Sequence, residues 1–252
     1  MKLESLLQYI DSYLGVAGHP DYSTALNGLQ VGGPTSVSKI ATAVDASQVT
    51  IDRAAELGAD ILLVHHGLFW DGLRPVVGRQ YTRLKALLDN DIALYSCHLP
   101  LDSHAEVGNC ALLARAIGVE PEGRVGSYKG VELGWWGRLD PPLPIEDFVG
   151  SVSAAVGGPV QALPGGPAQI ERVGVLTGGG GSFVREAAEL GLDAFVTGEG
   201  AHHTFFDAEE FGIHVLFAGH YATETFGIRA LGEHLAERFS LDTMFIDRPT
   251  GL

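Results

Sequence analysis

The sequence predicts an α/β protein built from two related α/β/α halves. Strand-like and helix-like segments alternate along most of the 252 residues, which is the pattern of parallel βαβ units. The segment AAELGAD at 54–60 recurs as AAELGLD at 187–193, at an offset of 133 residues. Alternation and recurrence together indicate an internal duplication.

The first half begins with a helix and continues as three strand–helix repeats. Leu3, Leu6, Leu7, Ile10 and Leu14 recur at helical spacing, and Gly15 follows as a stop signal. Short apolar runs predict the strands, and the segment SHAE beginning at Ser103 resembles a capping box that opens a helix. The expected helices cover 3–14, 47–57, 82–90 and 103–117, and the expected strands 39–44, 59–64 and 92–96.

The middle of the chain departs from this pattern before the alternation returns. A lone strand is expected at 131–139, a proline-rich turn and a helix within 141–156, and a loop at 157–167. Strands at 172–176 and 192–196 then flank a helix at 182–191. We therefore expect domains at 1–123 and 124–252, with the C-terminal segment packing back on the first half.

The recurrence extends beyond the matching heptapeptides. At the offset of 133, Ile40 falls on Val173 and Val64 on Thr197, so the flanking strands also correspond. HLPLD at 98–102 and HYATE at 220–224 both have a histidine and, four residues later, an acid. Their offset is 122, which implies that the second half has lost 11 residues in between.

Charge and composition exclude several classes of function. Asp and Glu number 31 against 16 Lys and Arg, a formal charge of −15, which disfavours nucleic acid and favours cations. Two cysteines, Cys97 and Cys110, are too few for a disulfide framework or a cysteine-rich zinc site. With neither a signal-peptide core nor a run near the ~20 apolar residues of a membrane span, the expected location is cytoplasmic, without a membrane partner.

Potential metal ligands follow three predicted strands: His65 and His66, then His98 and Asp102, then His220 and Glu224. The carboxyl ends of parallel strands share one edge, so these side chains could meet in the cleft between the halves. Neighbouring strand residues point to opposite faces, so the paired histidines suit two ions rather than one, with Gly67 permitting a turn. Asp102 and Glu224 are the candidate bridging carboxylates of two ions about 3.5–4 Å apart.

The two His-x-x-x-acid segments differ in the local structure that their sequences predict. On a helix, His220 and Glu224 would share a face, whereas Pro100 favours a loop between His98 and Asp102. A histidine pair is more often packed or solvated than metal-bound, and the argument for metal depends on the three strand ends together. Nitrogen and oxygen ligands suit Zn, Mn, Fe, Co or Ni, and the sequence does not choose among them.

Two further segments could serve a substrate. The glycine-rich TGGGGSFV at 177–184, with Gly180 and Ser182, could hold a phosphate at a helix start; a flexible turn explains it equally well. TGEGAHH at 197–203 supplies Glu199, His202 and His203 as candidate substrate-binding or acid–base groups, and an acidic helix start is at least as good an explanation. His98 or His203 could carry protons.

Several segments together resemble one known family. LLVHHGLFW, HLPLDSHAEVGN, GGGGSF, TGEGAHHTF and AGHYATETFGIRAL are similar to motifs of the Nif-three-like dinuclear-metal-centre family, also known as GTP cyclohydrolase I type 2-like proteins. The similarity runs from NGLQVGG at 27–33 almost to the C-terminus. One departure is His202, which stands where many relatives have tyrosine, while His203 matches their histidine.

The resemblance implies two similar α/β/α domains with two metal ions in the cleft. The paired histidines of the family's metal site fall on His65 and His66, and its aspartate falls on Asp102. The family's C-terminal histidine and glutamate fall on His220 and Glu224. It also implies a ring-shaped hexamer, and the segment 120–169 is too short for the domain that some members carry between the halves.

Two functions fit this set of residues. The first is a metal-dependent hydrolase, GTP cyclohydrolase-like, acting on a nucleotide or a related phosphorylated heterocycle. The second is a non-enzymatic protein that stores, delivers or inserts metal with the same ligands. A fixed site with an open coordination position would favour the first, and readily exchanged ions the second.

Overall fold

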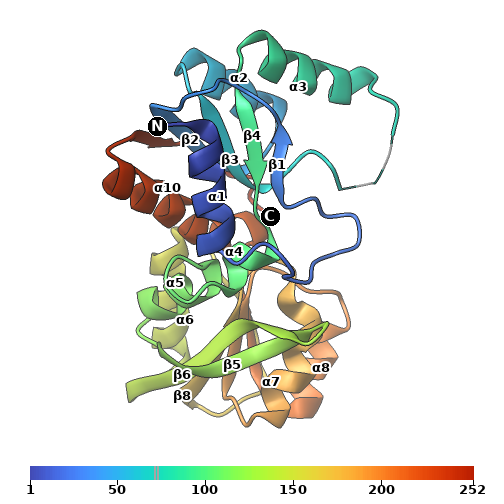
Figure 1. Ribbon diagram of the computed structural model, residues 1–252. Coiled ribbons are helices and arrows are strands. Elements are labelled where there is room, and N and C mark those ends of the chain that lie inside the picture. Colours follow the sequence, from blue (N-terminus) through green and yellow to red (C-terminus); the bar gives the residue numbers. More distant parts are fainter. Residues whose placement is uncertain (71, 73) are drawn as a thin grey trace. The chain divides into compact units, whose positions relative to one another are not determined.

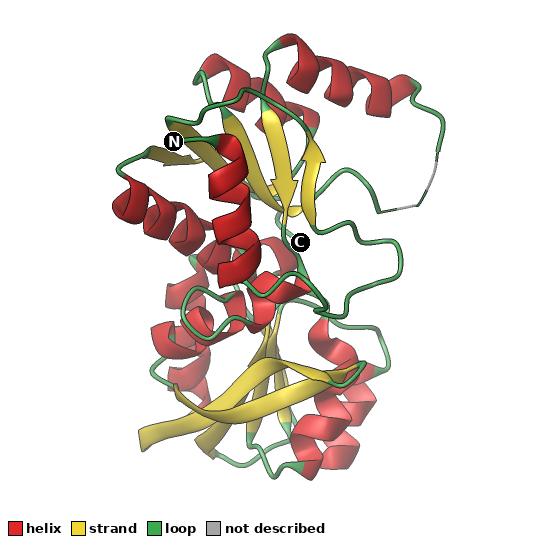
Figure 2. Ribbon diagram, in the orientation of Figure 1, coloured by secondary structure: helices red, strands yellow, loops and turns green. Residues whose placement is uncertain are grey.

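The computed structural model describes residues 1–70, 72 and 74–252, and the chain divides into two compact units. The first unit comprises 1–101 and 228–248, and the second comprises 102–227 and 249–252. Each unit has one β-sheet with helices packed on it (Figures 1 and 2). Over the described residues, no helix is long and apolar enough to cross a membrane.

The sheet of the first unit has five strands in the order β1-β4-β3-β2-β11. Strands β2, β3, β4 and β11 are parallel, and β1 pairs antiparallel with β4. Strands β2, β3 and β4 are buried along almost their whole lengths, as expected for parallel strands covered on both faces. The bounds are β1 Gly28–Val31, β2 Lys39–Asp45, β3 Ile61–His66, β4 Ala93–Ser96 and β11 Asp242–Phe245.

Helices cover both faces of this sheet. On one face, Ile51 and Ala54 of α2 and Leu87 of α3 pack into a core with Leu62 and Val64 of β3. On the other, the Tyr95 hydroxyl donates to Asp11 of α1 (2.7 Å), and α10 lies so close to β2 that a β-carbon at Gly232 would come 2.8 Å from Thr42. The helices are α1 Leu3–Tyr13, α2 Gln48–Glu56, α3 Gly78–Asp89 and α10 Thr225–Phe239.

The sheet of the second unit has six strands in the order β5-β6-β8-β9-β10-β7. Its centre, β8, β9 and β10, is parallel, and the flanking pairs β5–β6, β6–β8 and β10–β7 are antiparallel. The bounds are β5 Glu120–Tyr128, β6 Val131–Pro144, β7 Gln161–Leu163, β8 Gln169–Leu176, β9 Ala194–Thr197 and β10 His214–Phe217.

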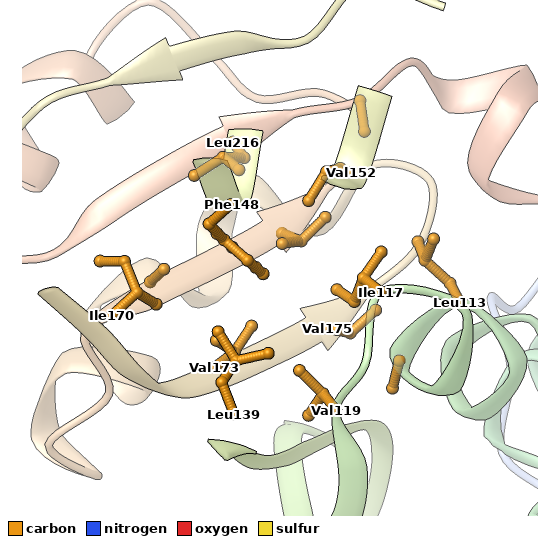
Figure 3. Packing of buried hydrophobic residues seen from close by; sticks show 14 residues of the cluster. Leu113, Ile117, Val119, Leu139, Phe148, Val152, Ile170, Val173, Val175 and Leu216 are labelled. Atoms are coloured by element: carbon orange, nitrogen blue, oxygen red, sulfur yellow. The ribbon is translucent and has the colours of Figure 1, made fainter. Parts of the chain in front are cut away.

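Two helices bury one face of the second sheet. Leu113 and Ile117 at the α5 end and Phe148 and Val152 of α6 pack on strand residues such as Val175 (Figure 3). Gly157 ends α6 in a left-handed conformation, φ +68°, which glycine adopts without steric cost. The helices are α5 Asn109–Ala116, α6 Ile145–Val156, α7 Val184–Glu189, α8 Thr204–Phe211 and α9 His220–Thr223, with a 3₁₀ turn at Gly180–Phe183.

The internal duplication is visible in the strand register. Ile40 pairs with Ile61, and Val173 pairs with Ala194; the differences 173 − 40 and 194 − 61 are both 133. The same offset relates β1 to β7, since Gly28 pairs with Ser96 and Gln161 with Phe217. The orders β1-β4-β3-β2 and β7-β10-β9-β8 therefore correspond strand by strand.

One offset differs from the expected value. Ser96 corresponds to Phe217, because they pair with the equivalent residues Val64 and Thr197. The difference, 217 − 96, is 121 rather than 122. His220 thus stands one residue beyond the position equivalent to His98, after Gly219, whose φ is +90°.

The division between the units falls at 101/102, whereas a boundary at 123/124 was expected. Helix α5 explains the difference, because Leu113 and Ala114 belong to the core of the second sheet. The C-terminal segment contributes β11 to the first sheet, where Asp242 to Phe245 pair with Lys39 to Thr42 of β2.

Several local expectations were wrong, among them the proline-rich turn after 139, where β6 continues to Pro144, and the loop over 157–167, which contains β7. The helix expected over 103–117 is divided into α4 (Leu99–Ser103) and α5, because His104 Nδ1 accepts the N–H groups of Glu106 and Val107 (both 3.2 Å) in the turn between them. Pro100 lies inside α4 rather than in a loop, since a first helical turn tolerates proline. The expected lone strand is half of a hairpin, whose other strand, β5, has too much glycine and charge to be recognised.

Candidate metal centre

Three histidines of the first unit lie together at the carboxyl edge of its sheet. His65 and His66 end β3, and His98 follows β4, which pairs with β3. Their ring centroids are 4.7 Å (His65–His66), 5.0 Å (His65–His98) and 5.6 Å (His66–His98) apart. One ring nitrogen from each lies within 4.8 Å of the others.

Each of these imidazoles is held through Nδ1 by an oxygen. His65 Nδ1 lies 3.0 Å from the carbonyl oxygen of Cys97, and His66 Nδ1 lies 3.0 Å from Asp45 Oδ1. His98 Nδ1 lies 2.9 Å from Asp21 Oδ1. Carbonyl and carboxylate oxygens only accept, so Nδ1 of every ring donates the hydrogen, which leaves Nε2 as the atom that can ligate a metal.

The sequence places these anchors by strand register. Asp45 ends β2 directly opposite His66 in the β2–β3 ladder. Asn27 precedes β1, whose Gly28 is paired with Ser96, and its Oδ1 accepts the His98 backbone N–H (2.8 Å). Asn27 also donates to Asp21 (2.8 Å), so the loop before β1 fixes the carboxylate that orients His98.

This arrangement fits a metal ion. Imidazoles that ligate metals typically give their second ring N–H to a carboxylate or carbonyl, which fixes both tautomer and orientation. His65, His66 and His98 all have this pattern, although His98 was expected to carry protons. His65 and His66 are the last two residues of a regular strand. Both side chains therefore reach the edge of the sheet.

The second unit builds a matching site at the edge of β8, β9 and β10. Glu199 follows β9, and His220 opens α9 after β10. His220 Nδ1 lies 2.8 Å from Glu199 Oε1, and its Nε2 lies 3.2 Å from Glu224 Oε1. The expected i, i+4 contact is therefore present. Two ligands about 2.1 Å from one ion lie roughly 3.0–3.4 Å apart, so the His220–Glu224 spacing suits shared coordination.

The electrostatics of this site favour a cation. Hydrogen bonding to Glu224 raises the pKa of His220 to about 9; burial opposes the shift, and Glu199 reinforces it. An imidazole held between two carboxylates takes up a proton that balances their negative charge. A bound divalent ion would balance the same charge.

Asp102 lies at the start of the second unit with its carboxylate fixed. Asn109 Nδ2 donates to Oδ1 (2.9 Å), and the Thr177 hydroxyl donates to the same oxygen (3.1 Å). Cys110 Sγ lies 3.3 Å from Thr177 Oγ1, and burial raises the pKa of its thiol to about 12, so Cys110 stays a neutral packing residue.

The other predicted substrate residues take different places. The Gly180 N–H donates to Thr197 Oγ1 (2.9 Å) and the Gly181 N–H to the Glu199 carbonyl (3.1 Å), so the turn uses these donors internally, while Ser182 is exposed. The Glu199 side chain orients His220. His203 is exposed at the start of α8, 3.9 Å from Asp207, and His202 is exposed beside it.

Sequence reasoning missed the residues that orient the ligands. Asp21 stands alone in a loop, where no sequence motif marks it, and Asp45 was interpreted as a helix cap. Ser47 has that role, since its Oγ accepts the Thr50 N–H. An acidic residue at the end of the neighbouring strand is a signal that could have identified Asp45.

Comparison with known proteins identifies the family. The model of the Duf34/NIF3 (NGG1p interacting factor 3) family matches residues 1–250. The chain belongs to the Duf34/NIF3 family. This confirms the resemblance inferred from the histidine pair and the HYATE segment.

Relatives in the Duf34/NIF3 family match over nearly their whole lengths. A protein of Halobacterium salinarum is 48% identical, covering 92% of this chain and 93% of the relative. One of Escherichia coli is 47% identical, covering 99% of each. Both are named GTP cyclohydrolase 1 type 2 homolog. A solved structure described as protein ybgI, of unknown function, has a TM-score of 0.94 and 46% identity, covering 100% of both chains.

Proposed function

We propose that this protein is a dinuclear metal-dependent hydrolase. Its two divalent ions would be bound by His65, His66, Asp102, His220 and Glu224. The observation that carries the proposal is the shared anchoring of His65, His66 and His98, whose Nδ1–H groups each donate to an oxygen of the same unit. Three imidazoles oriented alike, with ring nitrogens within 4.8 Å, are better suited to ligation than to packing.

The two ligand sets approach each other along the chain. The chain passes between the units at 101/102 and at 227/228, and Asp102 and Glu224 lie within four residues of these crossings. His98 and Asp102 are four residues apart, so their α-carbons lie within about 14 Å whatever the placement of the units.

The chain's own residues define what the site could do. When bound, divalent ions supply Lewis acidity that polarises a substrate oxygen and acidifies water. Asp21 and Asp45 keep His98 and His66 in the tautomer that presents Nε2. Glu199 does the same for His220. We include His98 as a further donor of the first set, in addition to the five ligands above.

The names of the relatives support a nucleotide or a related phosphorylated heterocycle as substrate class. The family resemblance supports assembly as a ring-shaped hexamer, which light scattering of the purified protein would detect as six times the 26.7 kDa chain mass.

The decisive experiment is metal analysis of untagged protein, followed by a hydrolysis screen over nucleotides with that metal restored. We expect about two ions per chain, and Asp102→Ala should lose at least one while remaining folded. Metal-replete protein that is inert across the panel, yet transfers its ions to an acceptor at a rate dependent on His65 and His66, would replace the hydrolase with a metal-delivery protein.

A further inference from the structure

A cavity of about 660 Å³ in the second unit includes in its lining Glu199, the residue that orients His220. Four segments form its walls: β7 with the turn before it, the loop between β9 and α8 with the first turn of that helix, the end of β10, and residues 251–252. All four segments lie within the described residues 74–252. A volume of several hundred cubic ångströms is typical of small-molecule sites.

In the first unit, the chain itself fills the equivalent place. The loop that precedes β1 folds over the carboxyl edge of the sheet, where Asp21 and Asn27 hydrogen-bond to His98. The Tyr22 ring lies beside the His98 ring, with centroids 5.6 Å apart. This loop therefore supplies polar groups and an aromatic ring to the residue that follows β4.

The corresponding loop of the second unit is much shorter. β7 corresponds to β1 in strand order, and Gly219 corresponds to His98. Residues 157–160 separate α6 from β7, whereas residues 14–27 separate α1 from β1. Gly219 and the first residues of β7 line the cavity. The duplication therefore leaves an open cavity in the second unit at the position that a loop covers in the first.

Aromatic and aliphatic side chains line this cavity. Phe205 near the start of α8 and Phe217 at the end of β10 provide two rings, and Val160 and Leu163 provide aliphatic contacts. A β-carbon at Gly200 would lie 2.7 Å from Phe217 Cζ, so glycine is required for the loop to pack on this ring. Phe205 is 38% exposed. Rings presented in this way bind planar groups of a ligand by stacking.

The lining carries a carboxylate but no strong cation. Among the described residues, Glu199 is the only acidic residue of the lining, and none is Lys or Arg. The Glu199 side chain is 57% exposed, so its carboxylate can accept a hydrogen bond in addition to that from His220. Such a site repels phosphate and favours an uncharged ring that presents N–H groups.

We propose that this cavity binds the heterocyclic ring of the substrate. The ring would contact Phe205 and Phe217, and a ring N–H or amino group would donate to Glu199. An uncharged planar ring with such donors has the chemistry of a nucleobase. Only the identification of this ring as part of the substrate rests on the proposed hydrolase function. Because Glu199 also accepts from His220, the ring would lie next to a proposed metal ligand.

Calorimetric titration of the as-purified protein with guanosine, adenosine and cytidine tests the proposal, because each has a planar base with an amino donor and none has a phosphate. Phe205→Ala should weaken binding of the tightest nucleoside about 5–100-fold, as expected for the loss of one stacked base. Phe211→Ala is the matched control. Phe211 ends the same helix, is 39% exposed and does not line the cavity, so its removal should leave the affinity unchanged.

Two further measurements test the polar contact and the exclusion of phosphate. Glu199→Gln should weaken nucleoside binding about tenfold, because a charge-assisted hydrogen bond becomes a neutral one. Ribose 5-phosphate, which has no base, should not displace the nucleoside. Displacement by ribose 5-phosphate would show that the cavity binds the phosphorylated end and would overturn the assignment.

Metal content and turnover of the same samples separate this proposal from the proposed function. Nucleoside binding that depends on Phe205, in metal-replete protein without turnover, supports the cavity and rejects the hydrolase. Turnover of a nucleotide without measurable binding of any of the three nucleosides overturns the cavity assignment and retains the hydrolase. Equal affinities of Phe205→Ala and the unaltered protein would also overturn it, and because the Phe205 side chain is exposed, this variant should fold.

Discussion

His220 lies between two carboxylates, with Nδ1 2.8 Å from Glu199 Oε1 and Nε2 3.2 Å from Glu224 Oε1. The hydrogen bond to Glu224 is the main reason why the pKa of this imidazole rises to about 9. In the metal-free protein a proton therefore occupies the ring at neutral pH, and a metal must displace it.

Metal affinity should accordingly increase with pH between about 7 and 9. Binding through His220 releases one proton below the raised pKa, so the logarithm of the affinity should rise with a slope of about one. Competition titrations with a chromophoric chelator would measure it. Glu199→Gln should lower the pKa of His220 and shift the dependence to lower pH, whereas Glu209→Gln, an exposed glutamate on α8, should not. Affinity independent of pH would exclude His220 as a ligand.

The same group should make the metal-free fold less stable in alkali. The pKa of His220 is raised from 6.5 to about 9 on folding, so its contribution is complete below pH 6.5 and disappears as the pH rises through about 9. The melting temperature of chelator-treated protein should fall across this window, and His220→Gln should reduce that fall. Equal pH profiles for the two proteins would show that the ion pairs contribute nothing to stability.

The carboxylates that orient His66 and His98 should control metal affinity without touching the ions. Asp45→Asn and Asp21→Asn replace an obligatory acceptor with an amide that can present N–H to Nδ1 and so select the wrong tautomer. Metal affinity should fall about 10–100-fold in each. Asp52→Asn, an exposed residue of α2, is the control. Unchanged metal content in all three proteins would refute the orienting role.

Gly180→Ala should destabilise the fold instead of weakening substrate binding. A β-carbon at Gly180 would lie 2.6 Å from Leu176 Cδ2 and 2.7 Å from Thr197 Oγ1, inside a buried turn. Such overpacking costs roughly 1–3 kcal/mol of unfolding free energy. Urea unfolding would measure the loss, with Gly150→Ala as control because nothing lies within 4 Å of its β-carbon position. Full stability with a raised KM would restore the phosphate role of the turn.

Strand and helix periodicity predicted most of the elements because it reflects local burial. Each of the parallel strands β2, β3, β8 and β9 contains a short, largely apolar run, and the repeated AAELG segment correctly indicated their common register. β5 was missed for a physical reason. Gly123 is required where the Trp136 ring lies across the hairpin, since a β-carbon would come within 2.5 Å of Nε1, and this long-range packing leaves no periodic signal.

The candidate ligands were predictable because they follow strands, whereas their anchors were not. Asp21 reaches His98 from 77 residues away, and Asn109 and Thr177 reach Asp102 from 7 and 75 residues further along the sequence. Such contacts arise only when the sheet is assembled, and no spacing rule in the sequence describes them.

Thr177 should support metal binding by fixing Asp102. Its hydroxyl donates to Asp102 Oδ1 (3.1 Å), and the two residues are 4% and 6% exposed. Thr177→Val keeps the shape but leaves the buried carboxylate with one fewer donor, which costs about 1–3 kcal/mol of stability. Metal affinity should fall about 10–100-fold, as for other residues that orient a ligand. Thr42→Val in β2 is the matched control. Thr42 is also buried, and it does not contact the proposed ligands. If Thr177→Val and Thr42→Val retain the same metal content, Asp102 is not a ligand whose orientation matters.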